Sequence, residues 1–181
     1  MDITAHLFLL LSIAALLVMS AFFSGSETAL FSLSRSSIAE MKKTGRRGRQ
    51  VAELLSKPRM LLVTILFGNL LVNIACTSAV TALAIALFGG KGIGYAMIST
   101  TFLILVFGEI APKSVALRHA RVMAPAMAPF LKGLMLVLTP VRLFLGSIAD
   151  FTVDRSRRIL GERREIYASS ELATAVETGH I

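Results

Sequence analysis

Short groups of polar residues interrupt the long apolar runs of this 181-residue chain. Their oxygens belong to hydroxyl, amide and carboxylate groups, and glycines lie among them. The candidate ligands of a bound ion are Ser24, Gly25, Ser26, Asn69, Asn73, Gly108 and Glu109. Oxygen donors of this kind suit Mg²⁺, Ca²⁺ or Na⁺, and the sequence has no thiolate or imidazole cluster suited to zinc or copper. The pattern therefore predicts a site for a hard cation.

The spacing of these residues indicates how helices would present them. Asn69 and Asn73 are four residues apart and so share one helical face, which Thr77 continues. Pro112 lacks the N–H group that would bond the Gly108 carbonyl, so this carbonyl is available to an ion. The candidates to orient the ligands or to hold a coupling ion are Glu27, Thr28 and Thr77.

Each polar residue also has a structural interpretation. Serine, threonine and glycine often serve only as packing contacts between membrane helices, and Asn69 and Asn73 would then be hydrogen-bond donors to a neighbouring helix. Glu27 would lie near the membrane surface, bonded to another helix. Glu109 would pair with Lys113, four residues later. We favour the ion site because ionisable residues within a membrane segment are costly and usually functional.

The composition indicates an integral membrane protein. The chain is 55% hydrophobic and only 17% charged, its mean hydropathy is +0.73, and its net charge is +8. It is too apolar for a disordered basic tail and too poor in charge for an ordinary nucleic-acid-binding protein, so we expect no nucleic-acid partner. The single cysteine, Cys76, excludes a disulfide within the chain. No hydrolase, kinase or redox motif is present, and we expect no enzymatic activity.

Three apolar stretches are long enough to span a bilayer, namely residues 7–33, 60–88 and 94–111. The connection between the first two is strongly basic, and the tail that follows residue 148 carries five arginines. Because basic loops stay in the cytoplasm, the N-terminus should lie outside and the C-terminus inside. We therefore predict a multi-pass protein of the cell membrane, either inner or plasma membrane, in contact with membrane lipids.

A fourth apolar stretch, residues 122–148, contains three prolines and two basic residues. A complete fourth crossing would place the arginines of the tail on the wrong side of the membrane. We therefore predict an all-α integral membrane protein with three transmembrane helices and a re-entrant or juxtamembrane helical hairpin on the cytosolic side. In this hairpin Lys132 and Arg142 would reach the membrane surface. Four complete spans remain the alternative.

Three motifs of the chain resemble those of a known membrane domain. They are residues 22–30 (FFSGSETAL), Gly68-Asn69 together with Asn73, and residues 108–113 (GEIAPK). In this order they resemble the signature segments of the DUF21 transmembrane domain, the membrane part of the CorC/CNNM family of magnesium transporters. The resemblance covers about residues 5–150 and divides the chain into a transmembrane domain, residues 1–150, and a cytosolic linker, residues 151–181. The linker would begin the connector helix to ATP-binding CBS domains, which full-length members carry and this chain lacks.

The resemblance also implies a homodimer that transports Mg²⁺ as its substrate. The family is associated with Mg²⁺ export, which is proposed to be coupled to the inward movement of Na⁺. The transported ion would lie among the three motifs, with Glu109 as the charged ligand and with Ser24 and the Gly108 carbonyl beside it. Two alternatives stay open. The domain would be a membrane anchor and dimerisation module whose function lies in the missing cytosolic domains, or it would carry another cation.

Overall fold

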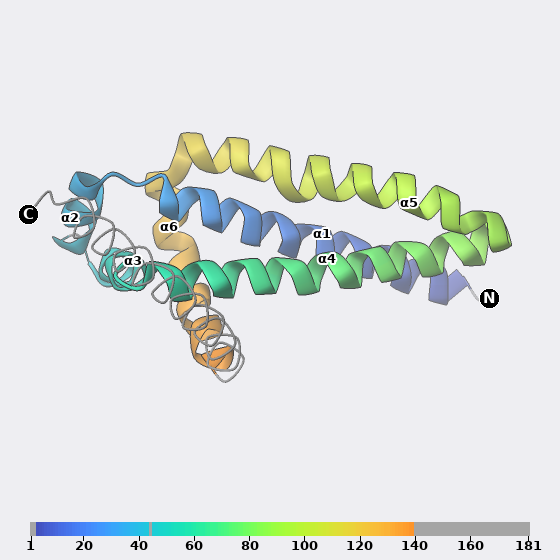
Figure 1. Cartoon of the computed structure of the whole chain (residues 1–181), viewed down its shortest axis with the longest axis horizontal. Helices are drawn as coiled ribbons and strands as arrows, with labels where there is room; N and C mark the ends of the chain where they lie inside the picture. Colours follow the sequence, from blue (N-terminus) through green and yellow to red (C-terminus); the bar gives the residue numbers. More distant parts are fainter. Residues whose placement is uncertain (1–2, 44, 140–181) are drawn as a thin grey trace, which may run out of the picture. The chain divides into compact units, whose positions relative to one another are not determined.

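The computed structural model describes residues 3–43 and 45–139, and this part of the chain is helical with short turns and without strands (Figure 1). The predicted all-α membrane fold is confirmed. The elements are α1 (Ile3–Phe31), α2 (Arg35–Lys43), α3 (Arg46–Leu55), α4 (Pro58–Phe88), the 3₁₀ turn η1 (Gly89–Lys91), α5 (Gly92–Leu103), the π-helix η2 (Ile104–Ile110) and α6 (Ala111–Val137).

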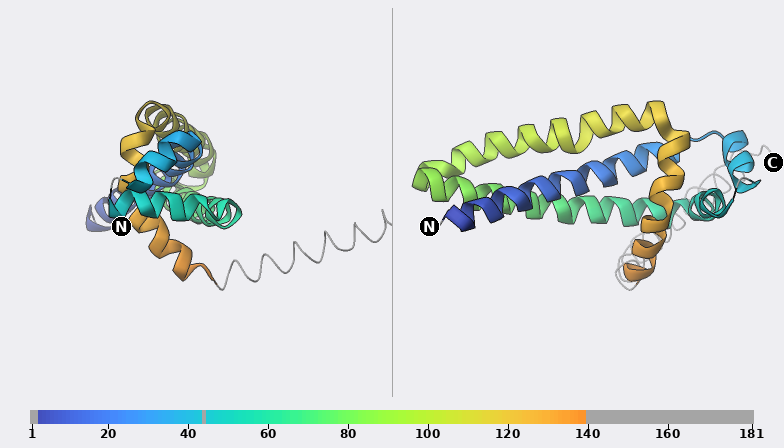
Figure 2. Two further views of the ribbon diagram at one scale, coloured as in Figure 1. Left: turned by 90° about the vertical axis from the view of Figure 1, so that its left-hand side faces the viewer. Right: turned by 180° about the vertical axis from the view of Figure 1, so that it is seen from behind.

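Long helices lie side by side in an elongated bundle formed by α1, α4 and α5 with η2 (Figures 1 and 2). Two helical stretches of the described chain, Ile3–Phe31 and Pro58–Val137, are long and apolar enough to cross a membrane. The second stretch reverses direction at η1, where Gly89 adopts a φ of +60° that favours glycine. This reversal falls between the second and third predicted apolar stretches, residues 60–88 and 94–111, while the number of membrane crossings stays a prediction from the sequence.

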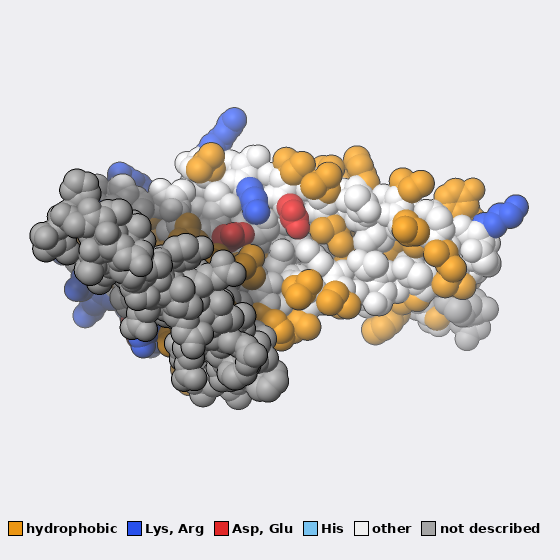
Figure 3. Space-filling model, viewed as in Figure 1, with side chains coloured by type: hydrophobic (Ala, Val, Ile, Leu, Met, Phe, Trp, Pro, Cys, Tyr) orange, Lys and Arg blue, Asp and Glu red, His pale blue; other side chains and the backbone are white. Residues whose placement is uncertain are grey.

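The core of the bundle lies where α1 packs between α4 and α6. Its fully buried side chains include Leu30 from α1, Leu61 and Ile65 from α4, and Leu131 from α6. The outer surfaces instead carry large exposed apolar side chains, such as Phe8, which is 70% exposed. Figure 3 shows such side chains distributed along the length of the bundle. An apolar exterior of this kind matches the lipid surroundings that the composition predicts.

The basic connection between the first two long helices forms two short helices, α2 and α3, which the sequence did not lead us to expect. In α3, Val51 and Leu54 are buried against the bundle. Glu53 of α3 faces outward, and its carboxylate accepts a hydrogen bond of 2.6 Å from Lys132 of α6. Lys132 therefore forms an ion pair with the protein, and its position at the membrane surface stays a prediction.

The path of α6 corrects one expectation from the sequence. We expected the prolines to break the segment after residue 122, but Pro125 and Pro129 lie inside a continuous helix. The break occurs earlier, at His119, whose φ of −119° and ψ of 25° are not helical. After this kink α6 turns away from the bundle axis and crosses α1 and α4 (Figures 1 and 2), with its buried face formed by small residues such as Ala124 and Ala128.

A helix that lies across one end of the bundle agrees with the juxtamembrane alternative for the first part of residues 122–148. The remainder of that stretch, with Pro140 and Arg142, lies outside the described residues. The predicted linker, residues 151–181, lies outside them as well.

Candidate cation site

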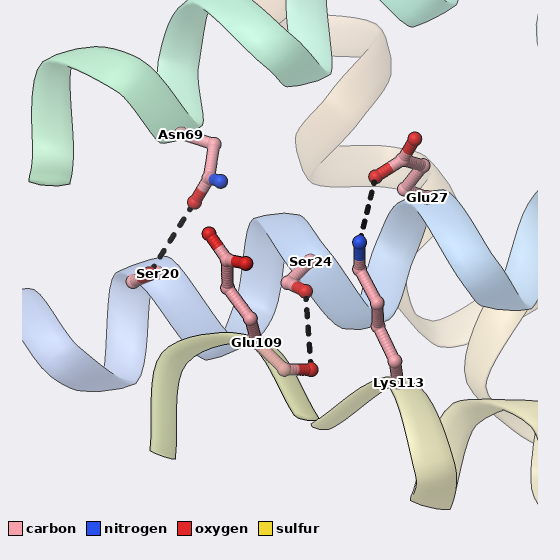
Figure 4. Close-up of polar contacts among 6 residues, drawn as sticks. All are labelled: Ser20, Ser24, Glu27, Asn69, Glu109 and Lys113. Atoms are coloured by element: carbon pink, nitrogen blue, oxygen red, sulfur yellow. Dashed lines mark hydrogen bonds and ion pairs between the residues drawn. The ribbon is translucent and has the colours of Figure 1, made fainter. Parts of the chain in front are cut away.

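Ser20 of α1 connects the two asparagines of α4. Its side chain is fully buried, and its hydroxyl donates a hydrogen bond of 2.7 Å to Oδ1 of Asn73. Oδ1 of Asn69 lies 3.3 Å from the same hydroxyl (Figure 4). A serine hydroxyl can donate only one hydrogen bond, and the nearer acceptor is the Asn73 amide oxygen. The Asn69 amide oxygen therefore stays available to another ligand. Asn69 and Asn73 thus share one helical face, as predicted.

Gly108 of the π-helix η2 packs directly against Ser20. A Cβ atom at Gly108 would lie 2.7 Å from Oγ and 3.3 Å from Cβ of Ser20. Glycine therefore permits η2 to approach α1 this closely. The local hydrogen bonding of η2 departs from that of an α-helix, since the N–H of Ala111 bonds to the carbonyl of Val106, five residues earlier. Such π-helical turns are rare and often accompany functional sites.

Ser24 lies on α1, one helical turn beyond Ser20. Glu109 follows Gly108 in η2. Ser24 is 2% exposed, and its hydroxyl lies 3.5 Å from the backbone carbonyl of Glu109, to which it donates. Figure 4 shows the Glu109 side chain extending toward the space between Ser20, Ser24 and Asn69. Four oxygen-bearing side chains from three elements thus face one region inside the bundle.

The Glu109 carboxylate is half-buried, and no donor or cation within residues 3–43 and 45–139 pairs with it. Its expected partner in the structural interpretation, Lys113, instead lies 3.7 Å from the Glu27 carboxylate (Figure 4). The Glu27 and Lys113 side chains are 30% and 46% exposed. The two acidic residues of the bundle therefore differ: a lysine faces the carboxylate of Glu27, while no cation of the described residues faces that of Glu109.

Two of the predicted ligands contact α6 rather than this region. The hydroxyl of Ser26 donates to the Phe22 carbonyl at 2.6 Å and lies 3.1 Å from Sδ of Met127. Gly25 faces the methyl groups of Met123 and Met127. The reason is helical geometry, because Ser20 and Ser24 are four residues apart while the next two residues turn toward another neighbour. Ligation by Gly25 or Ser26 stays a prediction that these contacts do not support.

The auxiliary positions have separate contacts. Thr77 is exposed, and its hydroxyl donates to the Asn73 carbonyl of its own helix at 2.8 Å. Thr28 is half-buried, and its carbonyl accepts the N–H of Ser32. Glu27 is held by Lys113, as described above. Of the three, only Thr77 contacts a member of the Ser20–Asn73 pair, and it bonds the Asn73 backbone carbonyl rather than the side chain that accepts from Ser20.

Ser20 itself was not among the residues singled out from the sequence. The signal was available, because Ser20 lies four residues before Ser24 and therefore on the same helical face. Its neighbours in the sequence are apolar, and one serine in an apolar helix usually bonds its own backbone or packs against another helix. Only the position of Asn69 and Asn73 opposite it identifies Ser20 as part of the site.

The donor set of the site limits its chemistry. The described residues contain no group of three or more His, Cys, Asp or Glu side chains that could hold a metal ion. A cation here would meet one carboxylate together with amide, hydroxyl and backbone carbonyl oxygens. These are ligands for a hard cation that keeps part of its water shell, as Mg²⁺ commonly does in proteins.

Comparison with known proteins gives a consistent set of relatives. The profile of the Cyclin M transmembrane N-terminal domain matches residues 11–180. The chain is 35% identical over 171 residues to a UPF0053 protein of Haemophilus influenzae, covering 94% of this chain and 40% of that protein. It is 34% identical over 155 residues to the UPF0053 inner membrane protein YfjD of Escherichia coli K12, with coverages of 85% and 35%. A chloroplastic DUF21 domain-containing protein of Arabidopsis thaliana is 38% identical over 163 residues, with coverages of 89% and 24%.

The chain therefore spans at most two fifths of the length of these relatives.

Proposed function

The chain belongs to the Cyclin M transmembrane domain family, and from this premise we propose that it transports Mg²⁺ across the membrane through the site around Glu109. The family is linked to Mg²⁺ transport in general. We propose Ser20, Ser24, Asn69 and Glu109 as the side chains that face the ion, with the Gly108 carbonyl beside them. No enzymatic activity is expected of this domain.

The observation that carries the proposal is the half-buried Glu109 carboxylate, which pairs with no cation among the described residues. An acidic residue near the centre of a membrane helix costs about 2.5–3.5 kcal/mol on insertion scales. A protein can offset such a cost with an internal ion pair, as it does for Glu27 through Lys113. At Glu109 the same role falls to a bound cation.

The charge balance of the site also supports an exchange mechanism. One carboxylate balances only half of the charge on Mg²⁺, so the ion would keep several waters and remain weakly enough held to leave. One Na⁺ would neutralise the same carboxylate fully. Because the two ions compete for one charged group, we propose that Mg²⁺ leaves the cell in exchange for Na⁺. The orientation with an outside N-terminus, the homodimer, and the control of transport by CBS domains in longer members are part of this proposal.

Flux through reconstituted protein tests the proposal. Wild-type protein in liposomes containing a Mg²⁺-sensitive dye should move Mg²⁺, and Glu109→Gln should abolish this movement because the charged ligand is lost. Glu53→Gln is the matched control, since Glu53 is an exposed carboxylate on α3 that pairs with Lys132 outside the site. An opposing Na⁺ gradient should accelerate the flux in wild type and in the control.

Absence of Mg²⁺ flux in the wild type would contradict transport by this domain and would favour the anchor and dimerisation function. Equal flux in wild type and Glu109→Gln would contradict the site. Mg²⁺ flux that requires Glu109 but does not change with a Na⁺ gradient would support the site and would contradict the exchange mechanism.

A further inference from the structure

A second polar feature of the bundle is a surface pocket of about 440 Å³ at the end of α1. It lies between the turn that connects α1 to α2 and the kink of α6, two segments that Figure 1 shows next to each other. The polar residues that line it are Ser32, Ser34, Ser37, Arg118, His119 and Arg121. None of these residues belongs to the proposed cation site, so the two regions can be tested independently.

The pocket is positively charged. Both ionised lining residues, Arg118 and Arg121, are cationic, and none of the acidic residues in the described part of the chain lines it. Neither guanidinium has an ion-pair partner within the described residues. An unpaired arginine pair in a concave surface is a binding site for an anion, because the guanidinium fork fits the oxygens of a carboxylate or phosphate.

The local backbone brings the two arginines to one pocket. Arg118 and Arg121 lie on either side of His119, whose non-helical φ and ψ redirect α6. On the facing wall the Ser34 hydroxyl accepts the N–H of Ser37 at 3.2 Å and so caps α2. The positive end of the α2 dipole therefore adds to the charge of the arginines.

The position of the pocket identifies the source of the anion. Ser32 immediately follows Phe31, the last residue of the long apolar helix α1, so the pocket lies where the apolar segment meets water. Two lining residues are apolar and largely exposed, Leu117 at 65% and Val122 at 73%. Phospholipid headgroups occupy this depth, with their acyl chains beside such residues. We propose that the pocket binds the phosphate group of an anionic phospholipid headgroup.

Lipid binding to the purified protein tests this proposal. Native mass spectrometry in detergent would be used to titrate the chain with phosphatidylglycerol, and with a diacylglycerol of the same acyl chains that lacks the phosphate. The pocket variant is Arg118→Gln/Arg121→Gln. The matched control is Arg46→Gln/Arg47→Gln, which removes the same charge from exposed positions of α3 outside the pocket. Circular dichroism would establish that both variants keep the helix content of the wild type.

We expect phosphatidylglycerol to bind the pocket variant at least about tenfold more weakly than the wild type, since two charge-assisted contacts are lost. The control should change by less than about twofold, because exposed charges away from the ligand are screened. Equal weakening in both variants would overturn the proposal in favour of diffuse attraction to basic helices. Equal binding of the diacylglycerol would overturn the role of the phosphate.

Inorganic phosphate separates a lipid site from a site for a free anion. Phosphate added in large excess should leave the bound phosphatidylglycerol in place, because it lacks the acyl chains that contact Leu117 and Val122. Displacement of the lipid by inorganic phosphate in the wild type would overturn the lipid assignment and would identify a pocket for a soluble phosphate.

Discussion

The close approach of η2 to α1 makes Gly108→Ala the most informative single change in the site. An added Cβ would lie 2.7 Å from Oγ of Ser20, well inside van der Waals contact. Ser20 is fully buried, and its hydroxyl is bonded to Asn73 at 2.7 Å. The new methyl group therefore either pushes η2 away from α1 or turns the Ser20 hydroxyl away from Asn73.

The expected cost follows from these contacts. Overpacking of a well-packed interior costs about 1–3 kcal/mol, and a buried hydroxyl left without its partner costs a similar amount. Replacing glycine by alanine inside a helix offsets part of this cost, because alanine stabilises a helix by about 0.5–1 kcal/mol relative to glycine. We therefore expect Gly108→Ala to lower the free energy of unfolding by about 1–2 kcal/mol, since only one of the two costs applies fully.

Thermal unfolding in detergent measures this effect, and Gly25→Ala provides the matched control. A Cβ at Gly25 would meet its nearest atom, a methyl carbon of Met123, at 3.6 Å, which is ordinary contact. Gly25→Ala should therefore melt at or above the wild-type temperature, while Gly108→Ala melts several degrees below it. Ser20→Ala, combined with Gly108→Ala, should recover part of the loss because the clashing Oγ is removed.

Equal melting temperatures for Gly108→Ala and Gly25→Ala would refute the reasoning. So would strict additivity of Gly108→Ala and Ser20→Ala, because residues in direct contact normally show a coupling of about 0.5–3 kcal/mol.

Three further variants test the remaining contacts. Gly68→Ala should lower the free energy of unfolding by about 1–3 kcal/mol, because its Cβ would lie 2.6 Å from the Phe23 ring. Combining it with Phe23→Leu should restore part of the lost stability in a thermal melt. An unchanged melting temperature for Gly68→Ala would contradict this packing. Glu27→Gln should change the Mg²⁺ dissociation constant by less than about twofold in calorimetry, since the Glu27 carboxylate already pairs with Lys113 at 3.7 Å. A large loss of Mg²⁺ affinity in this variant would identify Glu27 as a ligand. Thr77→Val should leave Mg²⁺ binding unchanged in the same measurement, because this hydroxyl is exposed and bonded to its own helix, and weaker binding would place it in the site.

Much of the fold could be predicted from the sequence because the length of an apolar run is a local property that fixes whether a helix can span the membrane. The three long apolar stretches correspond to α1, α4 and the segment formed by α5 and η2. The kink at His119 could not be predicted, since the prolines gave the stronger local signal. Pro125 and Pro129 are tolerated in a helix that packs across the bundle, and such packing is not visible in one segment of sequence.

The site was predictable in part for a related reason. Residue type and spacing singled out Asn69, Asn73 and Glu109 as candidates, because polar groups in apolar runs are costly. The sequence did not show which helix faces which, so it could not separate Ser24, which contacts η2, from Ser26, which contacts α6. The choice of partner for Lys113 also depended on the distance between helices, which only the structure provides.

Equilibrium binding of Mg²⁺ tests the central claim most directly. Isothermal titration of metal-free protein with Mg²⁺ should give saturable binding in the wild type and in Glu53→Gln. Binding to Glu109→Gln should be at least about tenfold weaker, because the only charged ligand of the site is lost. Absence of saturable binding in the wild type, or equal affinity in wild type and Glu109→Gln, would contradict the account.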